Sequence, residues 1–103
     1  MTDIGPLHVD DRVRYSTATV AALAGLSYRE VDYWCRNGAI WPYVEANGSG
    51  THRQWTSQQA SWLQAIAEVR QRALDRGLMM NLVAIADMWS TFARGDAWSL
   101  TLP

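Results

Sequence analysis

Apolar residues recur at three- and four-residue spacing along most of the chain, a pattern that predicts helices. The first such segment covers about 18–24, after a tail over residues 1–14. Ser16 and Thr17 precede it as capping residues, and Gly25 follows it as a break. The apolar side of this short helix consists of Val20, Leu23 and Ala24.

A second short helix is predicted over about 28–37. Ser27 and Glu30 match the S-x-x-E capping box, in which the hydroxyl and the carboxylate satisfy free N–H groups of the helix start reciprocally. Asn37-Gly38 supplies a left-handed end. One face of this helix is apolar, and the other is polar, aromatic and mostly basic. Two short helices joined by a turn that contains glycine form a helix-turn-helix.

The segment over residues 40–55 predicts two short strands around a flexible tip, Asn47-Gly48-Ser49-Gly50. Thr56 and Gln59 form a second capping box, which opens a longer helix over about 57–74 that Gly77 ends. These elements follow the helix-turn-helix directly, so we expect them to belong to the same domain.

A fourth helix is expected over about 79–94, before Gly95. Its apolar residues alternate by four and three positions, the spacing of a short coiled-coil seam. Such a seam favours a dimer interface and packing within the domain equally. Its members are Leu82, Ile85, Trp89 and Phe92.

The length and composition indicate one globular domain, since the chain has 103 residues, 49% apolar and 18% charged. We expect this domain over residues 15–95, with a short tail over 96–103. Six tryptophans can fill much of a small core, and three of them stand at buried spacing: Trp34, Trp55 and Trp62.

The charge argues against a polybasic binder, because the net charge is −1. All nine basic residues are Arg, whose planar guanidinium suits bidentate contacts to phosphates and base edges. Residues 12–53 carry five Arg against three carboxylates, so the segment with the helix-turn-helix has a surplus of two positive charges. A local basic face is therefore compatible with the near-neutral total.

Other kinds of site have little support. Cys35 has no partner for a disulfide within the chain, which fits a reducing compartment. Residues 1–11 lack the features of a secretory signal, and no apolar run approaches the ~20 residues that span a bilayer. We therefore expect a cytoplasmic protein without membrane contact. His8, His52 and Cys35 have no metal-ligand spacing, and no catalytic constellation or cofactor motif stands out, so we expect no enzyme and no cofactor.

The run from Tyr15 to Gly38, Y-S-T-A-T-V-A…G-L-S-Y-R-E-V-D-Y-W-C-R-N-G, resembles the N-terminal DNA-binding domain of the MerR family. That family reads Y-x-I-x-x-(L/V)-A…G-(V/L)-S-x-R-T-L-R-Y-Y-(E/D)-x-x-G-L. Residues 50–56, G-T-H-R-Q-W-T, stand where the family has the wing motif G-Y-R-x-Y-(S/T). The resemblance covers about residues 15–90 and looks strongest to an actinobacterial subgroup, and excisionase-like phage proteins share the domain.

The resemblance implies a mainly α winged helix-turn-helix with a small two-stranded wing and two further helices. It implies binding to double-stranded DNA, as a transcriptional regulator or as a phage recombination or excision factor. The helix over 28–37 would read the major groove and the wing would contact the backbone. A single such domain binds weakly, so a homodimer or a cooperative array is expected. The DNA-facing candidates are Thr17, Tyr28, Arg29, Tyr33, Arg36, His52 and Arg53.

Each candidate also has a structural interpretation. Thr17 also suits a helix cap, the tyrosines suit half-buried aromatic residues, and Arg29 suits a solvated surface residue. Arg36 suits a counter-ion for the helix C-terminus. His52 and Arg53 also suit exposed residues of a hairpin.

Two departures from the family pattern bear on function. Asp32 stands where most members have Arg, and a carboxylate there repels phosphates, accepts from a base such as cytosine N4, or orients Arg29 or Arg36. Family members also continue into a long dimerisation helix and an effector domain, so ligand sensing is not implied here. The net charge, Asp32 and the many tryptophans favour an alternative, a winged-helix module that binds a phage or host protein.

Overall fold

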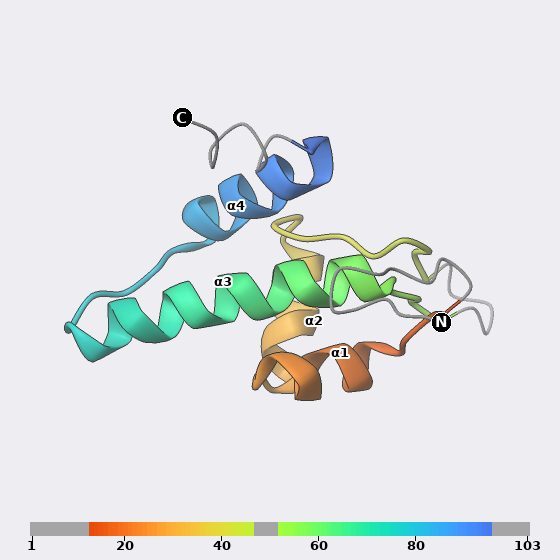
Figure 1. Ribbon diagram of the computed structural model, residues 1–103, viewed down its shortest axis with the longest axis horizontal. Coiled ribbons are helices and arrows are strands. Elements are labelled where there is room, and N and C mark those ends of the chain that lie inside the picture. The colour runs from red at the N-terminus through yellow and green to blue at the C-terminus, as the bar shows by residue number, and fades with distance from the viewer. Residues whose placement is uncertain (1–12, 47–51, 96–103) are drawn as a thin grey trace, which may run out of the picture.

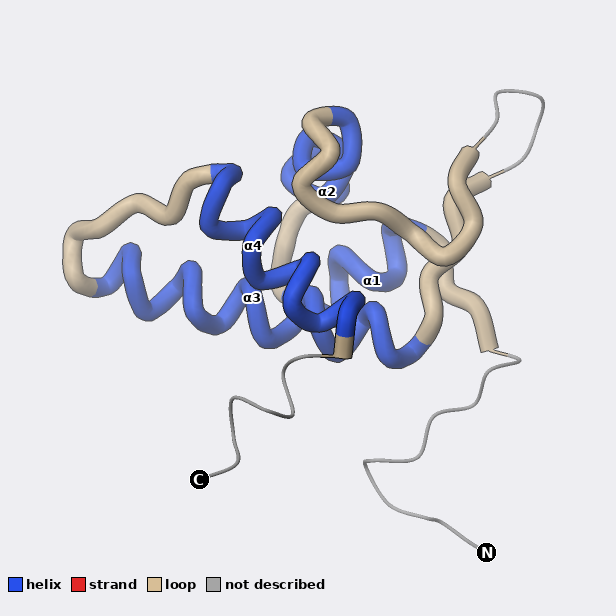
Figure 2. The backbone as a smooth tube through the Cα atoms, turned by 90° about the horizontal axis from the view of Figure 1, so that it is seen from above, coloured by secondary structure: helices blue, strands red, loops and turns tan. Residues whose placement is uncertain are grey.

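The computed structural model describes residues 13–46 and 52–95. Four helices follow one another in this part of the chain: α1 (Thr17–Ala24), α2 (Tyr28–Arg36), α3 (Ser57–Asp75) and α4 (Leu82–Arg94). α3 is the longest and packs against both α1 and α4, which lie on opposite sides of it in Figure 1. α2 packs against α1, and Figure 2 shows the same arrangement from above. The mainly α architecture is confirmed.

The turn between α1 and α2 depends on glycine. Gly25 adopts φ +72°, in the left-handed region that other residues enter at a cost. This conformation lets the Leu26 N–H donate to the carbonyl of Ala21 at 2.9 Å, which closes the end of α1. Ser16 caps the other end, where its Oγ accepts from the Thr19 N–H at 3.1 Å. The expected first helix is thus confirmed, with Thr17 as its first residue.

Both predicted capping boxes are present. The Ser27 Oγ accepts from the Glu30 N–H at 3.0 Å, while a Glu30 carboxylate oxygen accepts from the Ser27 N–H at 3.0 Å. Thr56 and Gln59 make the equivalent pair of bonds at the start of α3. No helix within residues 13–46 and 52–95 is long and apolar enough to cross a membrane.

The fourth helix begins later than the periodicity predicts. α4 starts at Leu82 and not at residue 79, because the Asn81 side chain accepts from the Ala84 N–H at 2.9 Å and caps the helix there. Residues 78–80 are therefore part of the connection from α3. Leu78 and Met79 are exposed in this connection.

The two expected strands over residues 40–55 are not formed in the part of the chain that the structure describes. Only isolated antiparallel bridges occur there, Val44 with Gln54 and Tyr15 with Trp55. Pro42 lacks an N–H and interrupts pairing at the start of this segment. The expected hairpin tip, Asn47-Gly48-Ser49-Gly50, lies outside the described residues.

The core centres on Trp89, whose side chain is fully buried. Three other indoles meet it edge to face: Trp62 at 5.3 Å between centroids, Trp55 at 6.0 Å and Trp41 at 6.2 Å. Edge-to-face contacts of this kind add to the free energy of burial. Phe92 extends the cluster by stacking on Trp62 at 5.9 Å. The tryptophans thus join α3, α4 and the segment before α3 into one core.

This core uses the seam that was a candidate dimer interface. Ile85 and Trp89 are 2% and 0% exposed, so their side chains pack inside the domain. Leu82 and Phe92 are partly buried against the same core. In this chain the four-and-three spacing therefore marks the face of α4 that packs within the domain. The exposed apolar residues nearby are Leu78, Met79 and Val83.

Candidate nucleic-acid interface

The two faces of α2 differ sharply in exposure. Val31 and Trp34 are 0% and 5% exposed and belong to the core. On the opposite face Tyr28 and Tyr33 are 54% and 55% exposed, and Arg29 is exposed as well. α2 therefore presents two phenols and a guanidinium to solvent from a helix whose other side is fixed.

α2 is held in place by contacts to α3. Glu30, besides closing the capping box, forms an ion pair with Arg70 of α3. The guanidinium of Arg70 also lies over the ring of Trp34, 5.7 Å from its centroid, a cation–π contact. The backbone bond from Ser27 and the charge of Arg70 keep the pKa of Glu30 below its ordinary value. The carboxylate is thus ionised at neutral pH and fastens the start of α2 to α3.

Asp32, on α2, is bound by two arginines. Its Oδ1 accepts from Arg53 Nη1 at 2.8 Å and its Oδ2 accepts from Arg36 Nε at 2.9 Å. Arg53 also donates from Nε to Glu45 at 3.1 Å. We call these four residues, Asp32, Arg36, Glu45 and Arg53, the Asp32 network. It joins α2 to the segments on both sides of the undescribed residues 47–51.

Burial differs within the Asp32 network. The Arg53 side chain is 17% exposed and that of Asp32 is 21% exposed, whereas the Arg36 side chain is 74% exposed. The hydrogen bond from Arg53 lowers the pKa of Asp32, and the bond to Asp32 raises the pKa of Arg53. Both groups are therefore charged at neutral pH. The network has no net charge, since two guanidiniums face two carboxylates.

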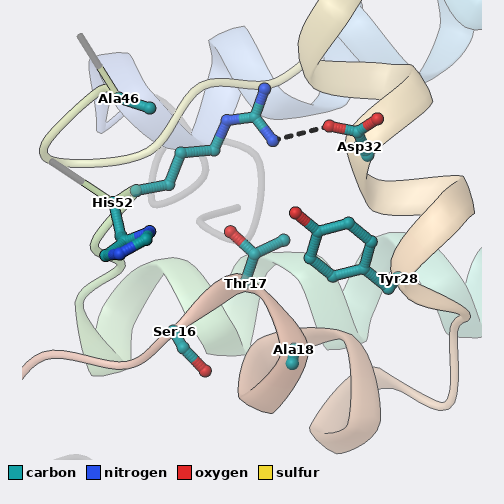
Figure 3. A pocket seen from close by; sticks show the side chains of 8 residues that line it. Ser16, Thr17, Ala18, Tyr28, Asp32, Ala46 and His52 are labelled. Carbon is teal, nitrogen blue, oxygen red and sulfur yellow. Dashed lines mark hydrogen bonds and ion pairs between the residues drawn. The ribbon is translucent and has the colours of Figure 1, made fainter. Parts of the chain in front are cut away.

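A pocket of about 390 Å³ opens between the start of α1, α2, Ala46 and residues 52–53. Figure 3 shows the phenol of Tyr28 and the side chain of Thr17 pointing into it, and the dashed line marks the ion pair of Asp32 with Arg53. Four of the seven expected DNA-facing residues line this pocket: Thr17, Tyr28, His52 and Arg53. Arg29, Tyr33 and Arg36 lie outside it.

Thr17 has a structural partner that the sequence did not indicate. The residue is 6% exposed, and its Oγ1 accepts from Trp55 Nε1 at 2.9 Å. Trp55 itself is fully buried. The hydroxyl of Thr17 therefore satisfies the indole N–H of a core residue, while Ser16 provides the cap. His52, by contrast, is exposed.

No group of three or more His, Cys, Asp or Glu side chains gathers to hold a metal ion within residues 13–46 and 52–95. Cys35 is partly buried, and this burial raises the pKa of its thiol to about 12. The thiol is consequently neutral and weakly nucleophilic at physiological pH.

Sequence reasoning offered Arg36 as one of two arginines that Asp32 could orient, and the structure pairs Asp32 with Arg36. Sequence reasoning missed the partners of Arg53. Asp32 and Arg53 are 21 positions apart, and Thr17 and Trp55 are 38 apart. No local sequence pattern predicts contacts between residues at such separations.

Over 78 residues, 75% of this chain, the sequence is 30% identical to uncharacterized HTH-type (helix-turn-helix) transcriptional regulators of Mycobacterium bovis and of two strains of Mycobacterium tuberculosis. The chain spans 33% of the length of these curated relatives. No protein-family model matches the chain. The chain is therefore similar to helix-turn-helix regulators, and the names of these relatives do not specify the MerR family.

Proposed function

We propose that this protein binds double-stranded DNA as a transcriptional regulator and has no enzymatic role. The observation that carries the proposal is the exposed face of α2, the second helix of a glycine-turned pair, with Tyr28, Arg29 and Tyr33 directed to solvent. The similarity to regulators named for a helix-turn-helix supports the same function. A phage recombination or excision factor would use the same interface.

In this proposal α2 enters the major groove, which is about 12 Å wide and admits one helix. Tyr28 and Arg29 stand in the first turn of α2, the part of a recognition helix that reaches base edges. The fork of Arg29 suits bidentate recognition of guanine or of a phosphate. Tyr33 lies on the same face and offers a hydroxyl to the backbone.

We further propose that the segment around residues 44–55 acts as the wing of a MerR-type domain. Its support is the ion pair that brings Arg53 to Asp32 on α2, which places this segment beside the proposed recognition helix. His52, next to Arg53 and exposed, is the proposed wing contact to the DNA backbone. Arg36 and Arg53 are secondary contacts in this scheme, because both are already paired.

A second candidate function is binding to another protein, and one observation favours it. The Asp32 network neutralises Arg36 of α2 and Arg53, while several large aromatic side chains of α2 and of the segment after it are exposed. Aromatic residues are enriched in protein interfaces and charges are depleted at their centres. The aromatic residues concerned are Tyr28, Tyr33, Trp41 and Tyr43.

Fluorescence anisotropy with labelled genomic duplexes across a salt series tests DNA binding. We expect affinity that falls steeply with salt, since contacts to phosphates release counterions. Arg29→Ala should lower the affinity by roughly 5- to 150-fold, the effect of about 1–3 kcal/mol from one base or phosphate contact. Arg72→Ala is the matched control, because Arg72 is also exposed but lies on α3.

Absence of binding to any duplex at low salt would overturn the proposal in favour of the protein-binding function. Equal losses with the two arginine variants would show that overall charge, and not α2, carries the binding.

Two copies acting together are part of the proposal, because one helix-turn-helix reads only a half-site. Since Ile85 and Trp89 are buried in the domain, a homodimer or cooperative array would use other surfaces. Light scattering of the protein alone and on DNA distinguishes a dimer in solution from assembly on DNA. A protein that is monomeric alone and binds DNA as a one-to-one complex would contradict this part of the proposal.

A further inference from the structure

Asp32 is the one carboxylate on the exposed side of α2 that lies between Arg29 and Arg36, where a DNA-binding helix has most reason to be positive. A lone carboxylate there would repel phosphates. In this protein each of its oxygens is occupied by a different guanidinium, from Arg53 and from Arg36. The local effect of Asp32 is therefore to hold two arginines, and together with Glu45 it offsets their charge.

The Asp32 network leaves α2 with little positive charge that is not ion-paired. Arg53 lies between Asp32 and Glu45 at 2.8 and 3.1 Å, and its side chain is only 17% exposed. Of the two arginines on α2, Arg36 is paired within the network. Arg29 is thus the cation of α2 that stands outside it.

A phosphate competes with a carboxylate for the same guanidinium fork, because both are planar or tetrahedral oxygen anions that accept two parallel N–H bonds. Arg53 donates to Asp32 from Nη1 and to Glu45 from Nε, so one of these bonds must break before Arg53 can grip a phosphate with two parallel N–H bonds. Arg36 keeps free N–H groups, but Asp32 beside it offsets the positive charge that attracts a phosphate. The pairing therefore weakens the phosphate contacts of these two arginines. Non-specific binding to DNA rests almost entirely on such contacts, whereas specific binding adds contacts to bases.

We propose that Asp32 is a specificity-determining residue: by sequestering Arg36 and Arg53 it suppresses non-specific attraction to DNA, so that binding depends on the base contacts of α2. The proposal rests on the DNA-binding function proposed above. In this proposal Asp32, which stands where the family has Arg, helps the protein to discriminate specific from non-specific DNA. Asp32 is a positioning residue in this scheme and makes no contact with DNA itself.

The test compares Asp32→Asn with the wild type on two labelled duplexes. One is a mixed random-sequence duplex, and the other is a duplex selected from a random pool by the wild-type protein. Glu68→Gln is the matched control, because it removes the same negative charge and also breaks a carboxylate–arginine pair, with Arg72 on α3.

For Asp32→Asn we expect tighter binding to the random duplex, with a log–log salt slope steeper by about 0.9 for each arginine that gains a phosphate. That slope corresponds to a gain on the order of tenfold per contact at ~50 mM salt relative to ~1 M. Affinity for the selected duplex should rise less, so the specificity ratio falls. Glu68→Gln should change neither slope nor ratio, and Asp32→Asn/Arg53→Ala should lose most of the gain.

An Asp32→Asn protein whose affinity for the random duplex and salt slope match those of Glu68→Gln would overturn the proposal, as would a loss of affinity for both duplexes. A merely structural role predicts such a loss. If Asp32→Asn does not fold, Glu45→Gln decides, since it releases the other side of Arg53 from an exposed position and should raise non-specific affinity in the same direction. A wild type that binds neither duplex contradicts the proposed function itself, and this inference with it.

Discussion

The hydroxyl of Thr17 offers a sharp test of whether this residue serves the fold or the DNA. Thr17→Val replaces the hydroxyl with a methyl group of similar size and so leaves the packing almost unchanged. The bond that is lost joins Thr17 Oγ1 to Trp55 Nε1 at 2.9 Å, and both residues are buried. The indole N–H of Trp55 then has no acceptor and no access to water.

Leaving a buried donor unsatisfied costs about 1–3 kcal/mol. For a domain of this size we expect the midpoint of thermal unfolding to fall on the order of 10 °C. Thr17→Ser keeps the acceptor and should retain most of the stability. Urea unfolding followed by tryptophan fluorescence or circular dichroism measures all three proteins.

A double-mutant cycle with Trp55→Phe isolates the bond from other effects of the two substitutions. In the Trp55→Phe background no donor remains, so Thr17→Val should cost little further stability. At a temperature where the variants are folded, Thr17→Val should bind DNA as the wild type does. If Thr17→Val were as stable as the wild type yet lost DNA affinity, Thr17 would be a DNA contact and the structural assignment would be refuted.

Three further measurements probe the fold: the stability of one glycine variant, the pH dependence of stability and the alkylation of Cys35. Gly25→Ala should lower the free energy of unfolding in urea by about 1 kcal/mol. The cost is backbone strain alone, because φ is +72° and an added Cβ would meet no atom within 4 Å. Unchanged stability would contradict this. Folding lowers the pKa of Glu30 and Asp32, so the unfolded chain binds more protons in acid. Stability should therefore be steady above about pH 6 and fall as the pH drops through their ordinary values of 4.5 and 3.8, less steeply in Asp32→Asn; urea midpoints from pH 7 to 3 check this. Cys35, with a thiol pKa of about 12, should react slowly with iodoacetamide at pH 8 in the folded protein and rapidly in urea, and equal rates would show that the thiol is accessible.

Local features of this fold are predictable from the sequence because the bonds that make them span three or four residues. The capping boxes of Ser27 with Glu30 and of Thr56 with Gln59 are visible as S-x-x-E and T-x-x-Q, and both form. The late start of α4 has an equally local cause in the cap by Asn81. The sequence prediction followed the apolar periodicity and did not use this cap.

The features that could not be predicted from the sequence depend on contacts between segments that are distant along the chain. The departure at Asp32 was evident, but its main partner, Arg53, comes from a segment that only tertiary packing brings to α2. The face of α4 was correctly expected to be apolar, yet periodicity cannot say whether such a face meets α3 or a second chain. Burial of Trp89 among three other indoles answers that question for the domain.

Selection of duplexes from a random pool by the wild-type protein, with Arg29→Ala and Arg72→Ala in parallel, tests the central claim most directly. The account predicts that the wild type and Arg72→Ala enrich the same short sequence motif, and that Arg29→Ala loses the motif or relaxes it at the base that Arg29 contacts. Failure of the wild type to enrich any motif, together with no retention of DNA at low salt, would contradict the claim that α2 reads DNA.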